Sequence, residues 1–183
     1  MMYFSAGDEY YAQLLEELKK AKHFIFLEFF IIQEGVFWNS ILDILTKKVA
    51  EGVEVKVIYD DMGSLRTLPP DYFLQLQDIG IETHRFNPVN ASLSLRQNNR
   101  DHRKIIVIDG YTSFTGGINL ADEYINKQQR INGYWKDTGV MLKGAATWSF
   151  TVMFLQFWQY LDKAPVDYEK YHLNEEELAQ YKK

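Results

Sequence analysis

The sequence contains no cysteine and, among its 183 residues, only four prolines and eleven glycines. The lack of cysteine excludes disulfides, zinc–thiolate sites, iron–sulfur clusters and a thiolate nucleophile. Few prolines and glycines, beside 46% hydrophobic residues, exclude a collagen-like or disordered chain. Basic residues are also too few, 20 against 25 acidic, so the net charge of −5 gives no attraction for nucleic acid beyond a local patch. The composition predicts one folded domain.

A long apolar targeting segment is also missing. Residues 1–22 mix acidic and basic side chains and lack the apolar stretch of a signal peptide. Residues 144–161 carry no charge and reach the length of a short membrane span, but Gln, Ser and Thr interrupt them. Their apolar residues recur at the spacing of one helical face: Phe150, Met153, Phe154, Phe157, Trp158 and Leu161. This segment therefore predicts a buried or half-buried helix.

The rest of the chain alternates between helical and extended patterns. Further helices are expected at 5–22, 35–52, 69–80 and 120–125. Strands are expected at 23–32, 53–59, 81–86, 104–108, 111–115 and 138–142. Asp109-Gly110 favours a hairpin between two of these strands, and residues 87–99 form a polar loop. The pattern predicts an α/β fold with a mixed β-sheet sandwiched between helices.

The strand that begins near residue 104 carries the strongest chemical signal. His102 and Lys104 are two residues apart, so we expect their side chains to share one face and one site. An ammonium offsets phosphate charge, and a histidine attacks phosphorus or moves a proton near neutral pH, which suits a phosphodiester substrate. Asp109 falls on the opposite face and is expected to stabilise the turn. Gly117 and Asn119 follow, where backbone and amide groups can approach a phosphate.

Four other charged residues are weaker candidates. Glu28 is a lone carboxylate in an apolar strand, so we expect it to face a cleft or meet a cation. Arg103 suits an anionic substrate or lipid headgroup, although a solvated loop explains it equally well. Asp60-Asp61 follows a predicted strand, but adjacent strand residues point to opposite faces, which disfavours joint ligation of one metal ion. No metal and no cofactor are expected.

The signature His102-x-Lys104-x-x-x-x-Asp109, followed by Gly116-Gly117-Ile118-Asn119, resembles that of the phospholipase D superfamily. The resemblance narrows to the first catalytic repeat of bacterial cardiolipin synthases and extends from about Tyr3 to Asp162. The segments that carry it are 27–31, 59–64, 98–104, 114–121 and 133–139.

This resemblance implies a phospholipase D-like repeat and a covalent mechanism. One histidine attacks the phosphodiester to form a phosphohistidine, and a second protonates the departing alcohol. His102 would be the nucleophile or the general acid, Lys104, Asn119 and Gly117 would contact phosphate, and Asp109 would be a structural clamp or part of the catalytic network. Donor and acceptor would both be phosphatidylglycerol, an anionic phospholipid, with glycerol leaving and no metal required.

Only one copy of the signature is present, whereas the family's sites use two. The other histidines, His23, His84 and His172, have no lysine two residues later. We therefore expect a partner, either a second H-K-D repeat in a longer chain or a homodimer partner. Residues 1–163 would form the catalytic repeat, and residues 164–183 a charged tail or the start of a linker to the second repeat.

The resemblance also implies a location. The full-length protein would lie at the cell membrane with its catalytic domain on the cytoplasmic face, and this part of it would be soluble. Two other functions stay open. One is a homodimeric single-motif phosphodiesterase such as a nuclease, which the net charge of −5 disfavours. The other is a catalytically inert half-domain used for folding or association.

Overall fold

The computed structural model describes residues 1–89, 95–127 and 133–181. Its centre is a seven-stranded sheet in the order β1-β7-β6-β5-β2-β3-β4. The strands are β1 (Met2–Phe4), β2 (Phe24–Phe29), β3 (Glu54–Asp60), β4 (Glu82–Phe86), β5 (Ile105–Ile108), β6 (Thr112–Gly116) and β7 (Gly139–Lys143). β2, β3 and β4 run parallel, and the other neighbouring pairs are antiparallel.

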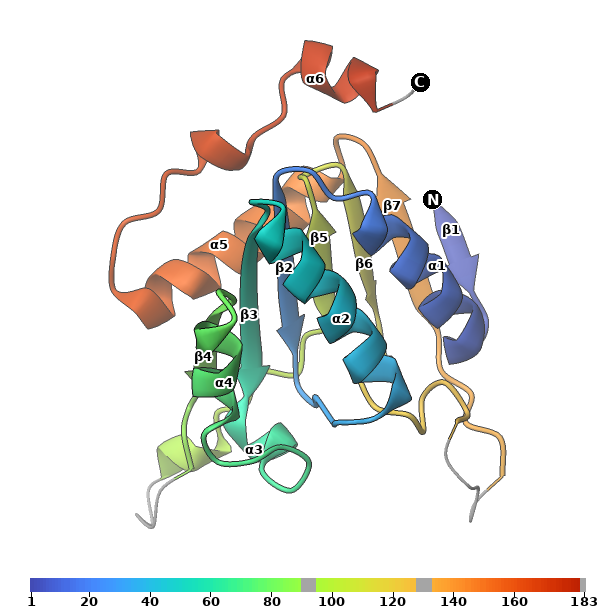
Figure 1. Cartoon of the computed structure of the whole chain (residues 1–183), viewed down its shortest axis with the longest axis vertical. Coiled ribbons are helices and arrows are strands. Elements are labelled where there is room, and N and C mark those ends of the chain that lie inside the picture. The colour runs from blue at the N-terminus through green and yellow to red at the C-terminus, as the bar shows by residue number, and fades with distance from the viewer. Residues whose placement is uncertain (90–94, 128–132, 182–183) are drawn as a thin grey trace.

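Helices cover both faces of the sheet, which confirms the mixed sheet sandwiched between helices (Figure 1). They are α1 (Gly7–Lys19), α2 (Val36–Ala50), α3 (Asp61–Ser64), α4 (Tyr72–Asp78), α5 (Thr147–Asp162) and α6 (Glu175–Gln180). α1, α2 and α4 contribute to the core on one face, and α5 packs on the other. Short 3-10 turns lie at Leu95–Asn98 and Glu169–Tyr171.

The central strand β2 explains why its sequence is apolar without alternation. Ile25 and Leu27 point into the core under α1 and α2, while Phe24 and Phe26 point toward α5. The Phe26 ring stacks on Phe154 of α5 with centroids 4.6 Å apart. Because both faces of this strand are covered, every residue of β2 is buried.

The structure differs from the prediction at two segments, the end of β2 and residues 120–125. β2 stops at Phe29 rather than at residue 32, and residues 120–125 form turns rather than a helix. The reason is a long-range exchange of backbone hydrogen bonds. Leu120 N–H donates to the Ile31 carbonyl, and Gln33 N–H donates to the Leu120 carbonyl. Because these groups are paired across two segments, the local bonds that a helix needs are lost. β1 and α3 were not predicted.

The predicted face of α5 is only partly correct. Phe154 and Trp158 are buried, but Met153 is exposed, and Thr147 and Thr151 take inward positions. The threonine hydroxyls donate to the carbonyls of Tyr111 and Thr147, respectively, so their burial leaves no unpaired oxygen. None of the helices in the three described ranges is long and apolar enough to cross a membrane.

The segment after α5 packs back on the sheet. Tyr171 is buried against the rings of Phe24 and Phe26. Lys170 pairs with Glu54 at 2.6 Å, and Tyr181 stacks on Tyr111 at 4.7 Å. This segment covers the end of the sheet where β2 begins, whereas β2 and β3 finish at the other end (Figure 1). The division of the chain at residue 163 stays a prediction.

Candidate active site

The predicted catalytic residues lie at the end of the sheet where β2 and β3 finish. β5 is antiparallel to β2, so the residues just before β5 lie beside the last residues of β2. Asp60, at the end of β3, shapes this region. One of its oxygens accepts N–H groups of Met62 and Gly63 and so caps α3, while the other accepts the N–H of Asp101 at 3.0 Å. The buried Asp60 carboxylate thus ties the segment that carries His102 to β3.

His102 and Lys104 meet as the two-residue spacing predicts. Lys104 Nζ lies 3.0 Å from His102 Nδ1 and donates to the His102 carbonyl oxygen at 2.7 Å. Lys104 is buried, whereas the imidazole is exposed. Phe30 forms a wall of this site, with its ring 4.7 Å from the imidazole. One imidazole edge is therefore fixed by the lysine, and the other is open to a ligand.

The proton arrangement of this pair sets its chemistry. Burial lowers the pKa of Lys104, while the charges of Asp101 and Asp137 act in the opposite direction. A ring protonated on both nitrogens can give its Nε2 proton to a leaving alcohol. A ring protonated on Nδ1 alone has a lone pair on Nε2, which can attack phosphorus. The geometry suits both roles.

Gly117 is connected to Lys104 indirectly, because it lies against the side chain of Asp137. A Cβ on Gly117 would overlap the Asp137 carboxylate, so only glycine fits there without a shift. Its N–H donates to the Thr138 carbonyl at 3.0 Å. The charge of Asp137 also acts to raise the pKa of Lys104, against the larger effect of burial, so this carboxylate lies near the candidate site. Asp137 was not singled out from the sequence, although it lies in segment 133–139, which carries part of the family resemblance.

Asn119 is buried and joins two segments of the site. Its Oδ1 accepts the Ile31 N–H at 3.1 Å, and its Nδ2 donates to the Tyr124 hydroxyl at 2.8 Å. An amide nitrogen carries two hydrogens, so Tyr124 uses one of them. The helix mouth expected around Asn119 is absent, because residues 120–125 form turns. Its contact with phosphate stays a prediction.

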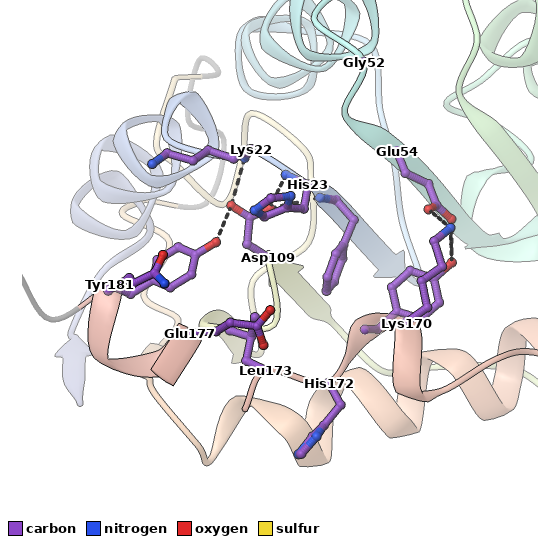
Figure 2. Close-up of a pocket in the computed structure, with 13 residues that line it drawn as sticks. Lys22, His23, Gly52, Glu54, Asp109, Lys170, His172, Leu173, Glu177 and Tyr181 are labelled. Atoms are coloured by element: carbon purple, nitrogen blue, oxygen red, sulfur yellow. Dashed lines mark hydrogen bonds and ion pairs between the residues drawn. The ribbon is translucent and has the colours of Figure 1, made fainter. Parts of the chain in front are cut away.

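Asp109 lies at the opposite end of β5 from His102, so the structure does not bring the two together. Its carboxylate accepts the N–H groups of Lys22, His23 and Phe24 at 2.8, 2.8 and 2.9 Å. The Tyr181 hydroxyl donates to it at 3.3 Å. Figure 2 shows it there, beside a pocket of about 660 Å³ that the tail helps to enclose. This geometry is that of a clamp between the hairpin and the start of β2.

Glu28 is fully buried and meets a cation, Arg103. Arg103 Nε lies 2.7 Å from Glu28 Oε1 and 2.8 Å from Asp101 Oδ1. Its guanidinium also covers the Phe157 ring of α5 at 4.6 Å. Burial, followed by the charge of Asp101, raises the pKa of Glu28 to about 9, although Arg103 opposes this rise. Glu28 therefore meets a cation inside the protein and does not line an open cleft.

Neither Asp60, the last residue of β3, nor Asp61, the first of α3, is set up for a metal ion. Arg100 lies 3.3 Å from Asp60, and Arg85 lies 3.4 Å from Asp61. Asp61 also accepts the Val89 N–H at 2.8 Å. Within residues 1–89, 95–127 and 133–181, no three acidic or histidine side chains form a group that could hold a metal. The two aspartates instead hold cations and loop backbone of the protein itself.

Comparison with known proteins gives the family. Residues 14–157 match the family model described as "Cardiolipin synthase, PLD-like domain". A Streptococcus mutans protein of undescribed function is 53% identical over 167 residues, which cover 91% of this chain and 35% of the relative. The cardiolipin synthase of Alkalihalophilus pseudofirmus is 44% identical over 84% of this chain and 30% of its own length. The chain thus spans about a third of these relatives.

Solved structures agree on the fold. Phosphatidylserine synthase of Haemophilus influenzae has a TM-score of 0.67 at 18% identity, covering 98% of this chain and 42% of its own. Nuc of Salmonella typhimurium, a phospholipase D family member, has a TM-score of 0.58 at 18% identity and covers 83% of this chain and 86% of its own. At such identities the similarity concerns the fold alone. Because the family model matches residues 14–157, most of this chain, the chain belongs to the phospholipase D-like domain family of the cardiolipin synthases.

Proposed function

We propose that this domain supplies one half of a phosphatidyltransferase active site, with His102 as its reactive group. The observation that carries the proposal is the contact between the exposed imidazole and the buried Lys104 ammonium, 3.0 Å apart. Lys104 offsets the charge of the phosphate, and the second hydrogen of the Asn119 amide approaches its oxygens. The Gly117 N–H is already bonded to the Thr138 carbonyl, so Gly117 contributes only the space that its missing side chain leaves. Asp109 holds the hairpin and the start of β2 in place and does not touch the substrate.

The reaction proceeds in two displacements. A histidine nitrogen attacks the phosphorus of one phosphatidylglycerol, the bond from phosphorus to glycerol oxygen breaks, and a second histidine gives its proton to the leaving glycerol. The hydroxyl of a second phosphatidylglycerol then attacks the phosphohistidine and returns a proton to that second histidine. The product is cardiolipin, and no cofactor takes part. His102 is one of the two histidines, and a second H-K-D repeat or a second copy of the chain supplies the other.

Exposed apolar side chains around His102 favour a lipid substrate over a nucleic acid. Met62 and Leu65 are exposed at α3, whose Gly63 lies against Phe30. Trp135 is 42% exposed, two residues before Asp137. Arg66 and Lys136 are exposed beside Leu65 and Trp135. Alternating apolar and basic side chains suit the surface of an anionic membrane, in line with a location of the whole protein at the cell membrane.

Intact-protein mass spectrometry tests the role of His102. The full-length protein is mixed with phosphatidylglycerol and quenched, and a phosphatidyl adduct on His102 is expected if this half supplies the nucleophile. The adduct should be lost in His102→Ala and kept in His23→Ala, a matched control at the other end of the sheet. Cardiolipin synthesis without an adduct on His102 would make it the general acid. Synthesis that survives His102→Ala would reject the proposal.

The single-motif nuclease makes the opposite substrate prediction, because it would cut plasmid DNA at low salt without any lipid. The inert half-domain predicts a stable protein with no turnover on either substrate. Variants of the exposed apolar side chains distinguish these two functions from that of an enzyme acting on lipid. Trp135→Ala and Leu65→Ser should weaken binding to phosphatidylglycerol vesicles and leave hydrolysis of a small water-soluble phosphodiester unchanged.

A further inference from the structure

Three buried side-chain oxygens in the described ranges have no hydrogen-bond partner, and all three lie next to His102. They are Oε1 and Oε2 of Glu28 and Oδ2 of Asp101. Glu28 is the fifth residue of β2 and is fully buried, and Asp101 directly precedes His102. Buried polar atoms are nearly always paired, so three unpaired oxygens in one cluster point to a missing hydrogen.

Arg103 does not provide that hydrogen. Its Nε lies within ion-pair distance of both carboxyls, but the N–H is directed at Asp101 Oδ1, at 2.8 Å. The same Oδ1 also accepts the backbone N–H of Arg103 at 3.3 Å. All donation from Arg103 therefore reaches one oxygen of Asp101. The other Asp101 oxygen and both Glu28 oxygens are left without a donor.

Charge in this cluster also does not balance when both carboxyls are ionised. Two buried anions would then meet one guanidinium. The Lys104 ammonium, whose pKa burial lowers and the charge of Asp101 raises, is held by His102 and forms no ion pair with either carboxyl, so the surplus negative charge would lack both a partner and water to solvate it. Hydrogen bonding with Asp101 adds to burial and charge in raising the pKa of Glu28 to about 9. A single added proton gives the missing donor and balances the charge, since one anion and one cation remain.

We propose that Glu28 carries a proton that it donates to Asp101 Oδ2, and that this bond positions His102 for the reaction. The connection runs through Asp101. Its Oδ1 closes a short turn onto the Arg103 N–H, and His102 is the middle residue of that turn. Asp60 fixes the start of the turn through the Asp101 N–H at 3.0 Å. Glu28 is a positioning residue, and its role in catalysis rests on the proposed function.

The charged groups near this proton are Asp101, Arg103 and Lys104. Asp101 and Arg103 act on Glu28 itself, whereas Lys104 is acted on by the charge of Asp101 and has its ammonium held by His102. Asp60 of β3 uses its oxygens on Met62, Gly63, Asp101 and Arg100, and α5 contributes the Phe157 ring over Arg103. Loss of the proton would leave two adjacent carboxylates that repel each other, so we expect the turn at His102 to loosen above pH 9.

Stability against pH tests the proton without any enzyme assay. The unfolded Glu28 ionises from its usual value of 4.5, while the folded one keeps its proton to about pH 9. Folding thus binds one proton in this window, so the unfolding equilibrium constant of the full chain should rise about tenfold per pH unit. Glu28→Gln replaces the O–H by an amide N–H, and it should remove this component. Glu34→Gln, at an exposed carboxylate, should keep it.

A second variant protects the test if Glu28→Gln does not fold. Asp101→Asn places the N–H on the other partner, so it can donate to Glu28 while its oxygen still accepts from Arg103. It too should abolish the pH component. Equal pH dependence in wild type and in either folded amide variant would overturn the shared proton.

The positioning role has its own readout. Cardiolipin synthesis by the full-length wild type should lose kcat on the alkaline side of pH 9, with little change in KM. Glu28→Gln should keep its kcat across the same range, and Glu28→Ala should lose kcat at every pH. If the stability test finds the proton but wild type and Glu28→Gln share one alkaline profile, the positioning role is overturned. If no variant, wild type included, makes cardiolipin, the proposed function fails while the stability test still decides the proton.

Discussion

The two halves of one sequence signature flank the two ends of β5. The carboxyl groups at these ends differ in how completely their oxygens are hydrogen-bonded. At the Asp109 end, one carboxylate accepts three backbone N–H groups and a tyrosine hydroxyl. At the His102 end, Glu28 and Asp101 leave three buried oxygens without a partner. The first arrangement stabilises the fold, and the second is the one in which we propose a retained proton and a reactive imidazole.

The difference teaches that H-x-K-x-x-x-x-D is not one catalytic cluster. A strand rises about 3.3 Å per residue, so seven residues separate His102 and Asp109 by roughly 20 Å. His102 and Lys104 form the pair that we propose to be reactive, while Asp109 joins the hairpin to the start of β2. The signature therefore combines one requirement of chemistry with one requirement of folding, and substitutions at its two ends should fail in different assays.

The largest effect is expected from removing the imidazole. His102→Ala in the full-length protein should lower the rate of phosphodiester turnover by about a thousandfold or more, because the group that attacks or protonates is lost. The free energy of unfolding should hardly change, since the imidazole is exposed. Turnover assays and urea denaturation measure the two quantities. A large decrease in the free energy of unfolding would contradict the proposed difference between the His102 and Asp109 ends of β5.

Asp109→Ala should have the opposite effect, with its main loss in the free energy of unfolding. Three N–H groups at the start of β2 lose their acceptor, and the alanine must also adopt the positive φ of 52°. We expect a loss of about 3 kcal/mol or more in the free energy of unfolding. Asp109→Asn tolerates this backbone and keeps one acceptor oxygen, so it should lose less. If Asp109→Ala abolishes turnover in protein that is as stable as wild type, Asp109 is catalytic and not a clamp.

Gly117→Ala tests the His102 end of β5 by adding one methyl group, without removing any polar group. The added methyl overlaps the Asp137 carboxylate, so that side chain must move away from its place beside Lys104. We expect turnover to fall by roughly ten- to a hundredfold, the size of effect that a small misplacement of catalytic groups has. The midpoint of thermal unfolding serves as the control and should move little. Unchanged turnover would exclude Asp137 from the site.

Tyr181→Phe should give the smallest effect. It removes one hydroxyl donor, 3.3 Å from Asp109, and leaves the three backbone N–H bonds and the stacking on Tyr111 in place. The expected loss is about 0.5–1 kcal/mol in the free energy of unfolding, with full turnover. Urea denaturation of wild type and variant resolves it. A loss as large as that of Asp109→Ala would show that the tail, and not the backbone, satisfies this carboxylate.

The sequence allowed most of the sheet and the contact between His102 and Lys104 to be predicted. Local periodicity identified the strands, and the Asp109-Gly110 dipeptide identified the hairpin. The spacing of His102 and Lys104 implied their contact because side chains alternate along an extended chain. These features depend on residues close together in the sequence.

Features that depend on distant contacts could not be predicted. Residues 120–125 lost their expected helix because Leu120 exchanges bonds with Ile31 and Gln33. The buried face of α5 turned toward Thr147 because a carbonyl at Tyr111 accepts its hydroxyl. The proton partner of Glu28 depends on how β2 pairs with the segment before β5. No local pattern contains that information.

The two edges of the sheet determine how a second copy of the domain can approach. β1 is only three residues long, and β4 carries Glu82 and Arg85. Short and charged edge strands resist pairing with another sheet, which protects against aggregation. Assembly by strand addition is thereby disfavoured at both edges. A partner that completes the site must then meet this domain at the ends of its strands, where His102 lies, and the symmetry axis of a homodimer would pass close to the two imidazoles.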